Sequence, residues 1–151
     1  MKTLLIVYHT GGVKTAQMAE AVERGAKTEP GLRVVVKRCA EAGPEDVLAA
    51  DGLILGTPEN FGYMSGMMKD FLERIFYACE GKVAGRPWAL FVGAGQDGTG
   101  AVSSVERIVT GLRLKKAADP VIVVKDLQPV QIAALEELGA TFASGLALGV
   151  L

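Results

Sequence analysis

The sequence predicts an α/β fold, in which a parallel β-sheet carries helices on both faces. Five short apolar runs, rich in Val, Ile and Leu, are continuous rather than alternating. This is the pattern of strands that are covered on both faces. Segments with apolar residues at helical spacing lie between these runs, and alternating strands and helices are typical of a sheet enclosed by helices. With 151 residues, of which 50% are hydrophobic and 22% charged, the chain is long enough for one core.

The predicted strands are the five apolar runs themselves. In chain order they are Leu4–Tyr8, Leu32–Val36, Gly52–Leu55, Trp88–Val92 and Val121–Val124.

Helices are predicted after the first, third, fourth and fifth strands, and a weaker helix of about two turns at Pro44–Ala50. The apolar face consists of Thr15, Ala19, Val22 and Ala26 in the helix after the first strand, and of Met67, Met68, Phe71, Leu72, Ile75 and Phe76 in the helix after the third. It consists of Val102, Val105, Ile108, Val109 and Leu112 in the helix after the fourth strand, and of Ile132, Leu135, Leu138, Phe142 and Leu146 in the helix after the fifth. Right-handed crossovers are expected between the parallel strands. We find no linker, repeat or low-complexity segment, so residues 1–151 are predicted to form one domain.

Composition and charge exclude several classes of function. A net charge of -1 and a pI of 5.9 give no electrostatic basis for binding nucleic acid or an anionic membrane. No apolar stretch approaches the roughly 20 residues that span a bilayer, and the run at Leu4–Val7 is too short for a signal peptide. Cys39 and Cys79 form no CxxC motif, and the single histidine, His9, excludes a multi-histidine metal site. We therefore expect a cytoplasmic protein without a metal.

The glycines point to a ligand site. A parallel sheet binds ligands beyond the carboxyl ends of its strands, and three segments follow predicted strands there: His9–Thr15, Gly56–Gly66 and Gly93–Gly100. These three segments contain nine of the nineteen glycines. Glycine makes up roughly one residue in eight of the chain, against a usual share of about 7%.

The first of these segments suits a phosphate. Gly11 and Gly12 can adopt positive φ angles and bring N–H groups close to a ligand, and the following helix N-terminus favours an anion. Thr10, Lys14 and Thr15 add hydroxyl groups and a positive charge. The alternative is a tight strand-to-helix turn without a ligand. A Walker loop is excluded because Val13 precedes Lys14, and this segment lacks the pattern G-x-G-x-x-G because no third glycine follows Gly11 and Gly12 at the needed spacing. A cysteine phosphatase is excluded because the segment has no cysteine.

The other two segments suit a flat heterocycle. Pro58, Phe61, Gly62 and Tyr63 combine a stiff start, two aromatic rings and a permissive turn. The alternative is that Phe61 and Met64 belong to the core. Four glycines in the third segment indicate unusual backbone angles or a close ligand, with Gln96 and Asp97 as hydrogen-bonding groups; the alternative is a flexible surface loop. Together the three segments predict a mononucleotide with a large heterocycle.

At this point the sequence resembles the flavodoxin-like family of FMN-binding proteins, in particular small bacterial flavodoxin-family proteins and NAD(P)H-dependent FMN or quinone reductases. The most specific match is Gly56-Thr57-Pro58-Glu59-Asn60-Phe61-Gly62-Tyr63-Met64-Ser65-Gly66, followed by Met68–Arg74, which resembles the family's flavin-ring loop and its helix. The resemblance implies a three-layer sandwich with a five-stranded parallel sheet of order 2-1-3-4-5. In the first segment Gly12 stands where the family usually has threonine, and Val13 stands where it usually has glycine.

The resemblance also implies the cofactor and its contacts. The FMN phosphate is expected at Thr10–Thr15, and the isoalloxazine between Pro58–Met64 and Ala94–Gly98. The cofactor-binding residues are then Thr10, Gly11, Gly12, Val13, Lys14, Thr15, Pro58, Glu59, Asn60, Phe61, Gly62, Tyr63, Met64, Ala94, Gly95, Gln96, Asp97 and Gly98. The flavin carries the chemistry, so no catalytic side chain is expected. His9 either titrates near neutral pH or makes a structural hydrogen bond.

The function implied first is an FMN-dependent reductase that takes hydride from NAD(P)H and reduces a quinone or free flavin. One alternative is a flavodoxin that carries single electrons between partner proteins, although such carriers are usually strongly acidic. Another is a scaffold that has lost FMN, suggested by Gly12 and Val13. A homo-oligomer is also possible, in which case Leu146–Leu151 forms an interface rather than a packed helix end.

Overall fold

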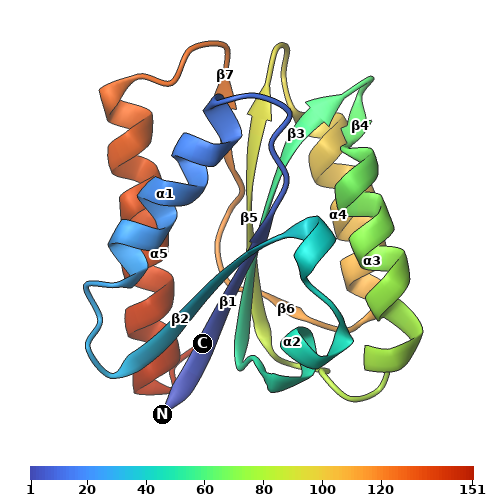
Figure 1. Cartoon of the computed structure of the whole chain (residues 1–151). Helices are drawn as coiled ribbons and strands as arrows, with labels where there is room; N and C mark the ends of the chain where they lie inside the picture. The colour runs from blue at the N-terminus through green and yellow to red at the C-terminus, as the bar shows by residue number, and fades with distance from the viewer.

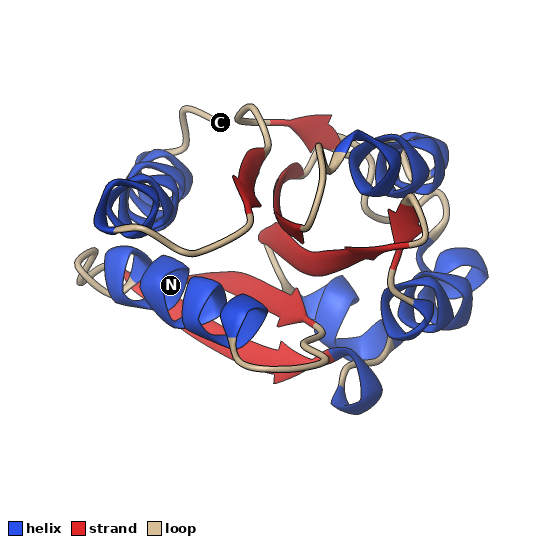
Figure 2. Ribbon diagram, turned by 90° about the horizontal axis from the view of Figure 1, so that it is seen from above, coloured by secondary structure: helices blue, strands red, loops and turns tan.

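A computed structural model describes residues 1–151 as a twisted sheet between two layers of helices (Figure 1). The strands are β1 (Lys2–Tyr8), β2 (Leu32–Arg38), β3 (Gly52–Asn60), β4 (Tyr63–Met64), β5 (Pro87–Ala94), β6 (Lys115–Lys116) and β7 (Val121–Val124). The helices are α1 (Lys14–Ala26), α2 (Pro44–Ala49), α3 (Gly66–Cys79), α4 (Thr99–Gly111) and α5 (Pro129–Leu148), with a 3-10 turn at Cys39–Glu41. Figure 2 shows α1 and α5 together on one face of the sheet, and the other helices on the opposite face.

The strand order confirms the flavodoxin-like prediction. The parallel ladder runs β2-β1-β3-β5, and β7 pairs with the end of β5, so the five predicted strands lie in the order 2-1-3-4-5. The sheet has two further short strands. β6 pairs with the start of β5, and β7 pairs with its end. Between these two pairings β5 has two residues, Ala89 and Leu90, whereas the other side has four, residues 117–120. This mismatch interrupts the edge of the sheet and divides it between β6 and β7.

The sequence suggested that the whole of the second glycine-containing segment is a loop, but its first part belongs to a strand. β3 continues past Leu55 to Asn60, with Thr57 and Pro58 paired to Val92 and Gly93 of β5, and the chain then returns antiparallel as β4. Gly56 is therefore a strand residue. A Cβ atom there would overlap the Phe91 ring, so packing within the sheet requires glycine at this position.

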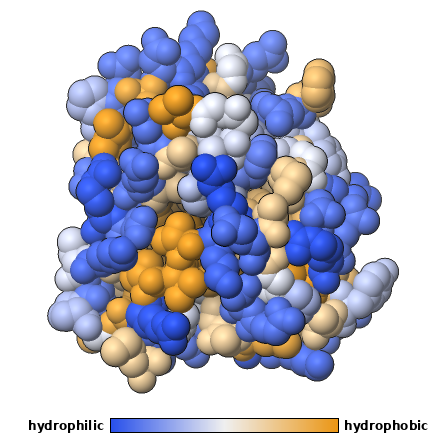
Figure 3. All heavy atoms as spheres, in the orientation of Figure 1, coloured by the Kyte–Doolittle hydropathy of each residue, from blue (hydrophilic) through white to orange (hydrophobic).

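Both faces of the sheet are buried, as the continuous apolar runs predict. Leu5 and Val7 of β1 join the core beneath α2, α3 and α4, whereas Leu4 and Ile6 join the core beneath α1 and α5. On the outer surface in Figure 3, apolar residues form several separate patches among hydrophilic ones. No helix combines the length and hydropathy that crossing a membrane requires.

The end of the chain packs against its own helix. Leu146 is buried, Leu151 lies against the core of the α1/α5 face, and Gly145 provides the space for the Leu151 side chain. Gly149 ends α5 in a left-handed conformation. Leu146 and Leu151 thus belong to a packed helix end, and Leu148 and Val150 stay exposed.

Two glycines set the close crossing of α1 and α5. A Cβ atom on Gly25 would overlap the carbonyl oxygen of Glu136, and one on Gly139 would overlap that of Val22. The two backbones are therefore in direct contact in the second half of α1.

We predict that Gly139→Ala lowers the free energy of unfolding by about 1–3 kcal/mol, because the new methyl group forces the two helix backbones apart. Urea denaturation measures this change. The matched control is Gly66→Ala at the start of α3, where a Cβ atom meets nothing within 4 Å. An equal loss of stability in both variants would contradict the role of the glycine contact.

We also predict that both thiols resist modification in the folded protein. Cys39 and Cys79 are free and buried, and burial raises the pKa of Cys39 to about 12 and raises that of Cys79. The reactive thiolate is therefore scarce at pH 8. A disulfide-exchange reagent should label both cysteines in denaturant and neither in the native protein; fast native labelling would contradict the packing of this core.

Candidate functional site

A cavity of about 500 Å³ opens at the carboxyl edge of the sheet, a size typical of small-molecule sites. It lies where the chain leaves β1, β3, β5 and β7. The residues that line it are Thr10, Gly11, Gly12, Val13, Lys14, Thr15, Pro58, Asn60, Gly93, Ala94, Gly95, Lys125 and Asp126. The first and third glycine-containing segments thus meet at one place with the end of β3.

The segment before α1 presents unused hydrogen-bond donors. None of the backbone N–H groups from Thr10 through Ala16 donates a hydrogen bond within the chain. The Thr10 hydroxyl donates to the Gly12 carbonyl at 2.7 Å and fixes the bend of this segment. Seven N–H groups around a cavity form an arrangement that binds anions.

The two glycines of this segment do not act as the sequence suggested. Neither Gly11 nor Gly12 has a positive φ angle, and a Cβ atom on either would meet nothing within 4 Å. Val13 is right-handed, with φ -100°, so its side chain causes no strain there. The glycines therefore leave space open at the cavity rather than permit an unusual backbone angle.

Lys14 reaches across the sheet from the start of α1. Its Nζ donates to the Ala94 carbonyl at 3.1 Å and to the Val123 carbonyl at 2.8 Å. Partial burial lowers the pKa of this ammonium, and the carboxylate of Asp126 acts in the opposite direction. Lys14 therefore connects α1 to the ends of β5 and β7.

The turn between β3 and β4 is a two-residue hairpin. Phe61 and Gly62 both have positive φ, 54° and 68°, as a type I′ turn requires. The Met64 N–H donates to the Ser104 hydroxyl and the Ser65 N–H to the Thr57 hydroxyl, both at 3.0 Å. The hairpin is thereby fastened to α4 and to β3.

The hairpin decides the open question about its apolar residues. Met64 is buried and belongs to the core, whereas Phe61 is fully exposed at the tip and Tyr63 is 44% exposed. A bulky residue with positive φ is uncommon. A phenyl ring fully exposed in that conformation is a candidate contact surface for a ligand or partner.

Glu59 fastens the third segment to the hairpin. Its two carboxylate oxygens accept hydrogen bonds from the Gly98 N–H at 3.2 Å and the Ala101 N–H at 3.1 Å, which are donors at the start of α4. A Cβ atom on Gly100 would overlap the Gly62 carbonyl oxygen, so α4 begins in direct contact with the hairpin. The third segment is therefore held in place rather than a flexible surface loop.

The remaining residues of the third segment have distinct roles. Gly98 has φ 76°, a conformation that favours glycine. Asp97 accepts hydrogen bonds from the Thr99 N–H and hydroxyl, which lower the pKa of its carboxyl group. The N–H groups of Gly95 and Gln96 donate no hydrogen bond within the chain, so they add two free donors near the first segment.

The predicted site residues fall into two groups. Ten line the cavity: Thr10, Gly11, Gly12, Val13, Lys14, Thr15, Pro58, Asn60, Ala94 and Gly95. The other eight do not line it: Glu59, Phe61, Gly62, Tyr63, Met64, Gln96, Asp97 and Gly98. His9 donates its backbone N–H to Gly56, and partial burial and the charge of Arg38 lower the pKa of its imidazole.

Three lining residues were missed by the sequence analysis: Gly93, Lys125 and Asp126. Lys125 and Asp126 directly follow the fifth apolar run. The rule that ligands bind beyond the carboxyl ends of the strands would have found them if it had been applied to that run. Gly93 had been counted in the third segment but is a β5 residue against Thr15 and Met18.

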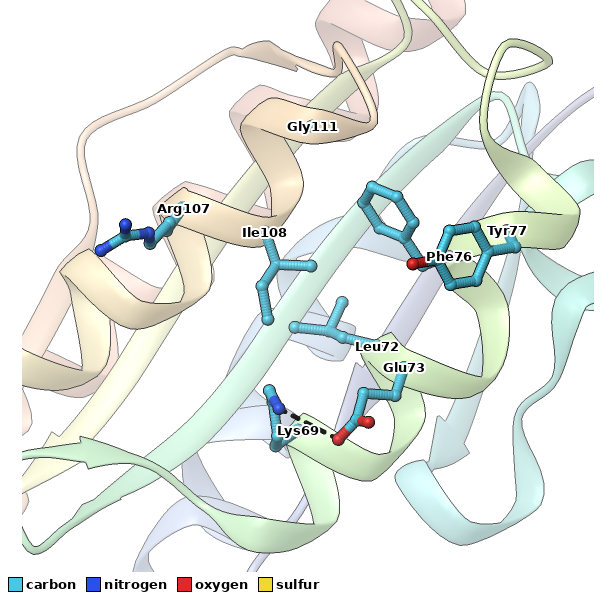
Figure 4. Close-up of a pocket in the computed structure, with 8 residues that line it drawn as sticks. All are labelled: Lys69, Leu72, Glu73, Phe76, Tyr77, Arg107, Ile108 and Gly111. Carbon is cyan, nitrogen blue, oxygen red and sulfur yellow. Dashed lines mark hydrogen bonds and ion pairs between the residues drawn. The ribbon is translucent and has the colours of Figure 1, made fainter.

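A second cavity, of about 370 Å³, lies between α3 and α4 (Figure 4). Leu72, Phe76 and Ile108 point into it, and the ion pair of Lys69 with Glu73 lies at its rim. Its walls are helix interiors, where backbone N–H groups are already hydrogen-bonded. It therefore lacks the free main-chain donors that an anion requires.

Comparisons with known proteins agree with this architecture. The family model described as NADPH-dependent FMN reductase matches residues 36–125. A flavodoxin of Aquifex aeolicus (strain VF5) is 37% identical over 112 residues, which cover 74% of this chain and 60% of that protein. An NAD(P)H dehydrogenase (quinone) of Acidithiobacillus ferrooxidans is 34% identical, with 61% of this chain and 56% of that protein covered. The solved structure of a flavodoxin from the domain Archaea superimposes with a TM-score of 0.83 at 18% identity, covering 95% of this chain and 98% of that one.

The fold thus defines a flavodoxin-like protein, with a cavity at the carboxyl edge of its parallel sheet. More particularly, the chain belongs to the NADPH-dependent FMN reductase family. It spans about 60% of the length of the curated relatives it matches.

We predict that Glu59→Ala lowers the free energy of unfolding by about 1–2 kcal/mol, because two N–H groups at the start of α4 lose their acceptor. The control is Glu73→Ala, which removes an exposed ion pair with Lys69 and should cost about 0.5 kcal/mol or less. Urea denaturation of both variants makes the comparison. Equal costs would show that the Glu59 carboxylate does not fasten the two segments.

Proposed function

We propose that the protein binds FMN in the cavity at the carboxyl edge and uses it to transfer hydride from NAD(P)H to a quinone or free flavin. The observation that carries this proposal is the run of seven N–H groups without a partner in the chain, Thr10 to Ala16, of which the first six belong to residues that line the cavity. Such a run suits an acceptor with several oxygens, and a phosphate monoester supplies them.

In this proposal the phosphate of FMN lies at Thr10–Thr15. The start of α1 adds the partial positive charge of its dipole. Gly11 and Gly12 leave the approach unobstructed, and no residue of this segment has a positive φ angle.

The isoalloxazine ring is assigned to the space between Pro58–Met64 and Ala94–Gly98. The free N–H groups of Gly95 and Gln96 suit the carbonyl oxygens and ring nitrogens of the heterocycle. The exposed faces of Phe61 and Tyr63 suit its apolar part. Glu59 keeps the two ring-side segments at a fixed separation through Gly98 and Ala101.

When bound, FMN would supply the hydride and single-electron chemistry. The chain contributes binding and orientation: main-chain donors hold the phosphate, and the fastened hairpin and α4 set where the ring lies. No protein acid or base is required by this proposal.

A single-electron carrier between partner proteins is the second candidate. It is favoured by the relative from Aquifex aeolicus, which is named a flavodoxin. The net charge of -1 favours the reductase, because a carrier that docks to basic partners benefits from a strongly acidic surface.

The first test is to titrate the purified protein with FMN and follow flavin fluorescence, then to add NADH or NADPH without oxygen. We expect saturable binding and rapid bleaching of the flavin absorbance. Binding without bleaching by either nucleotide would support the carrier. No binding at high micromolar FMN would contradict both redox proposals and leave a scaffold without flavin.

We also predict that the double change Gly12→Thr, Val13→Gly tightens FMN binding by about three- to tenfold. It adds a hydroxyl donor at an open position and removes a side chain beside the phosphate segment. Riboflavin, which has no phosphate, is the control ligand and should bind both proteins equally. Unchanged or weaker FMN affinity would show that the phosphate does not bind at this segment.

A further inference from the structure

The Lys14 side chain joins segments that belong to different parts of the proposed FMN site. Lys14 is the first residue of α1, directly after the phosphate segment. Ala94 is the last residue of β5, directly before the ring-side residues Gly95 and Gln96. Val123 lies in β7, which leads to Lys125 and Asp126 at the cavity. The two hydrogen bonds of the ammonium thus hold three strand-to-helix connections together.

The Lys14 side chain passes over the end of β5. Lys14 crosses β5 over Gly93, where a Cβ atom would lie 3.6 Å from Cε of Lys14 and 3.1 Å from Oγ1 of Thr15. The same Ala94 carbonyl also accepts the Lys125 N–H at 2.8 Å. The end of β5 is therefore fixed from two sides, and the side chain that fixes it comes from the phosphate segment.

A lysine beside an anion site is ordinarily taken for an anion ligand, but the geometry here opposes that role. Two of the three N–H donors of the ammonium are engaged with carbonyl oxygens. Swinging the ammonium to a phosphate would leave both carbonyls without this partner in a partly buried place. The phosphate segment needs no such movement, because its seven main-chain donors are free.

We infer that Lys14 is a positioning residue, which holds the phosphate segment and the ring-side segment in register, and that it does not bind the phosphate. The inference rests on the proposed FMN site for its ligand. It implies that Lys14 supports phosphate and ring binding alike, whereas the main-chain N–H groups of Thr10–Ala16 provide the preference for FMN over riboflavin.

The test compares the affinities of FMN and riboflavin for the wild type, Lys14→Met and Lys115→Met. Lys14→Met should weaken both ligands by a similar factor, about tenfold, so that the ratio of the two affinities stays constant. Lys115→Met removes a lysine charge that is exposed on β6 and lies outside the cavity, so both affinities should stay constant. Lys14→Arg keeps a long cationic donor and should restore most of the affinity for both ligands.

A second readout needs no flavin. In the amide NMR spectrum of the ligand-free protein, Lys14→Met should shift and broaden the signals of Gly95, Gln96 and Gly98. These residues belong to the ring-side segment, whereas Lys14 belongs to the phosphate segment. Lys115→Met, outside the cavity, is the control and should leave these signals unchanged. Thermal unfolding first confirms that each variant is folded.

Three outcomes would overturn the inference. If Lys14→Met weakens FMN binding and leaves riboflavin binding unchanged, Lys14 is a phosphate ligand. No change in either affinity, or unchanged Gly95 and Gln96 signals, would show that the two hydrogen bonds position nothing. If the wild type bound neither flavin, the proposed function would fail, and the NMR spectra would still decide whether Lys14 couples the segments.

Discussion

The structure depends on one constraint: a parallel sheet that is buried on both faces sends every strand-to-helix connection to the same edge. The ladders of β1, β3, β5 and β7 end there together, and the helices that follow cannot use the N–H groups of their own first turns. Free donors from distant parts of the chain are thus gathered around one cavity. The helix that follows the most donor-rich of these connections, α1, packs backbone to backbone against α5 at Gly25 and Gly139.

The excess of glycine has three separate causes at this edge. Packing requires Gly56 and Gly100, whose Cβ atoms would overlap the Phe91 ring and the Gly62 carbonyl. Backbone conformation favours Gly62 and Gly98, which have positive φ. Open space remains at Gly11, Gly12 and Gly95, where nothing would contact a Cβ atom, and these are the positions that can admit a ligand. Charged side chains act mainly on the backbone: Glu59 and Lys14 fasten segments to one another.

The sequence predicted the five main strands and the helices, because burial on both faces leaves a strong apolar pattern. The strand order came from the family resemblance and not from that pattern. The ends of the strands were harder to predict, because β3 continues through Pro58 to Asn60 and these residues have no apolar pattern. The hairpin was also not evident, since a type I′ turn with Phe61 in the first position departs from the usual Asn-Gly signal. The partners of Glu59 are about 40 residues away and those of Lys14 are 80 and 109 residues away, so no local pattern reveals these roles. Lys125 and Asp126 were predictable, because they follow an apolar run as the other site segments do.

The central claim is that three connections far apart in the sequence form one flavin site. Amide NMR signals followed during addition of FMN to the labelled protein test it most directly. Signals of Thr10–Ala16, Asn60–Met64 and Ala94–Gly98 should shift together and saturate at the same FMN concentration, with those of the α3–α4 cavity, such as Phe76 and Ile108, unchanged. Shifts confined to the α3–α4 cavity, or to one of the three connections alone, would contradict the account.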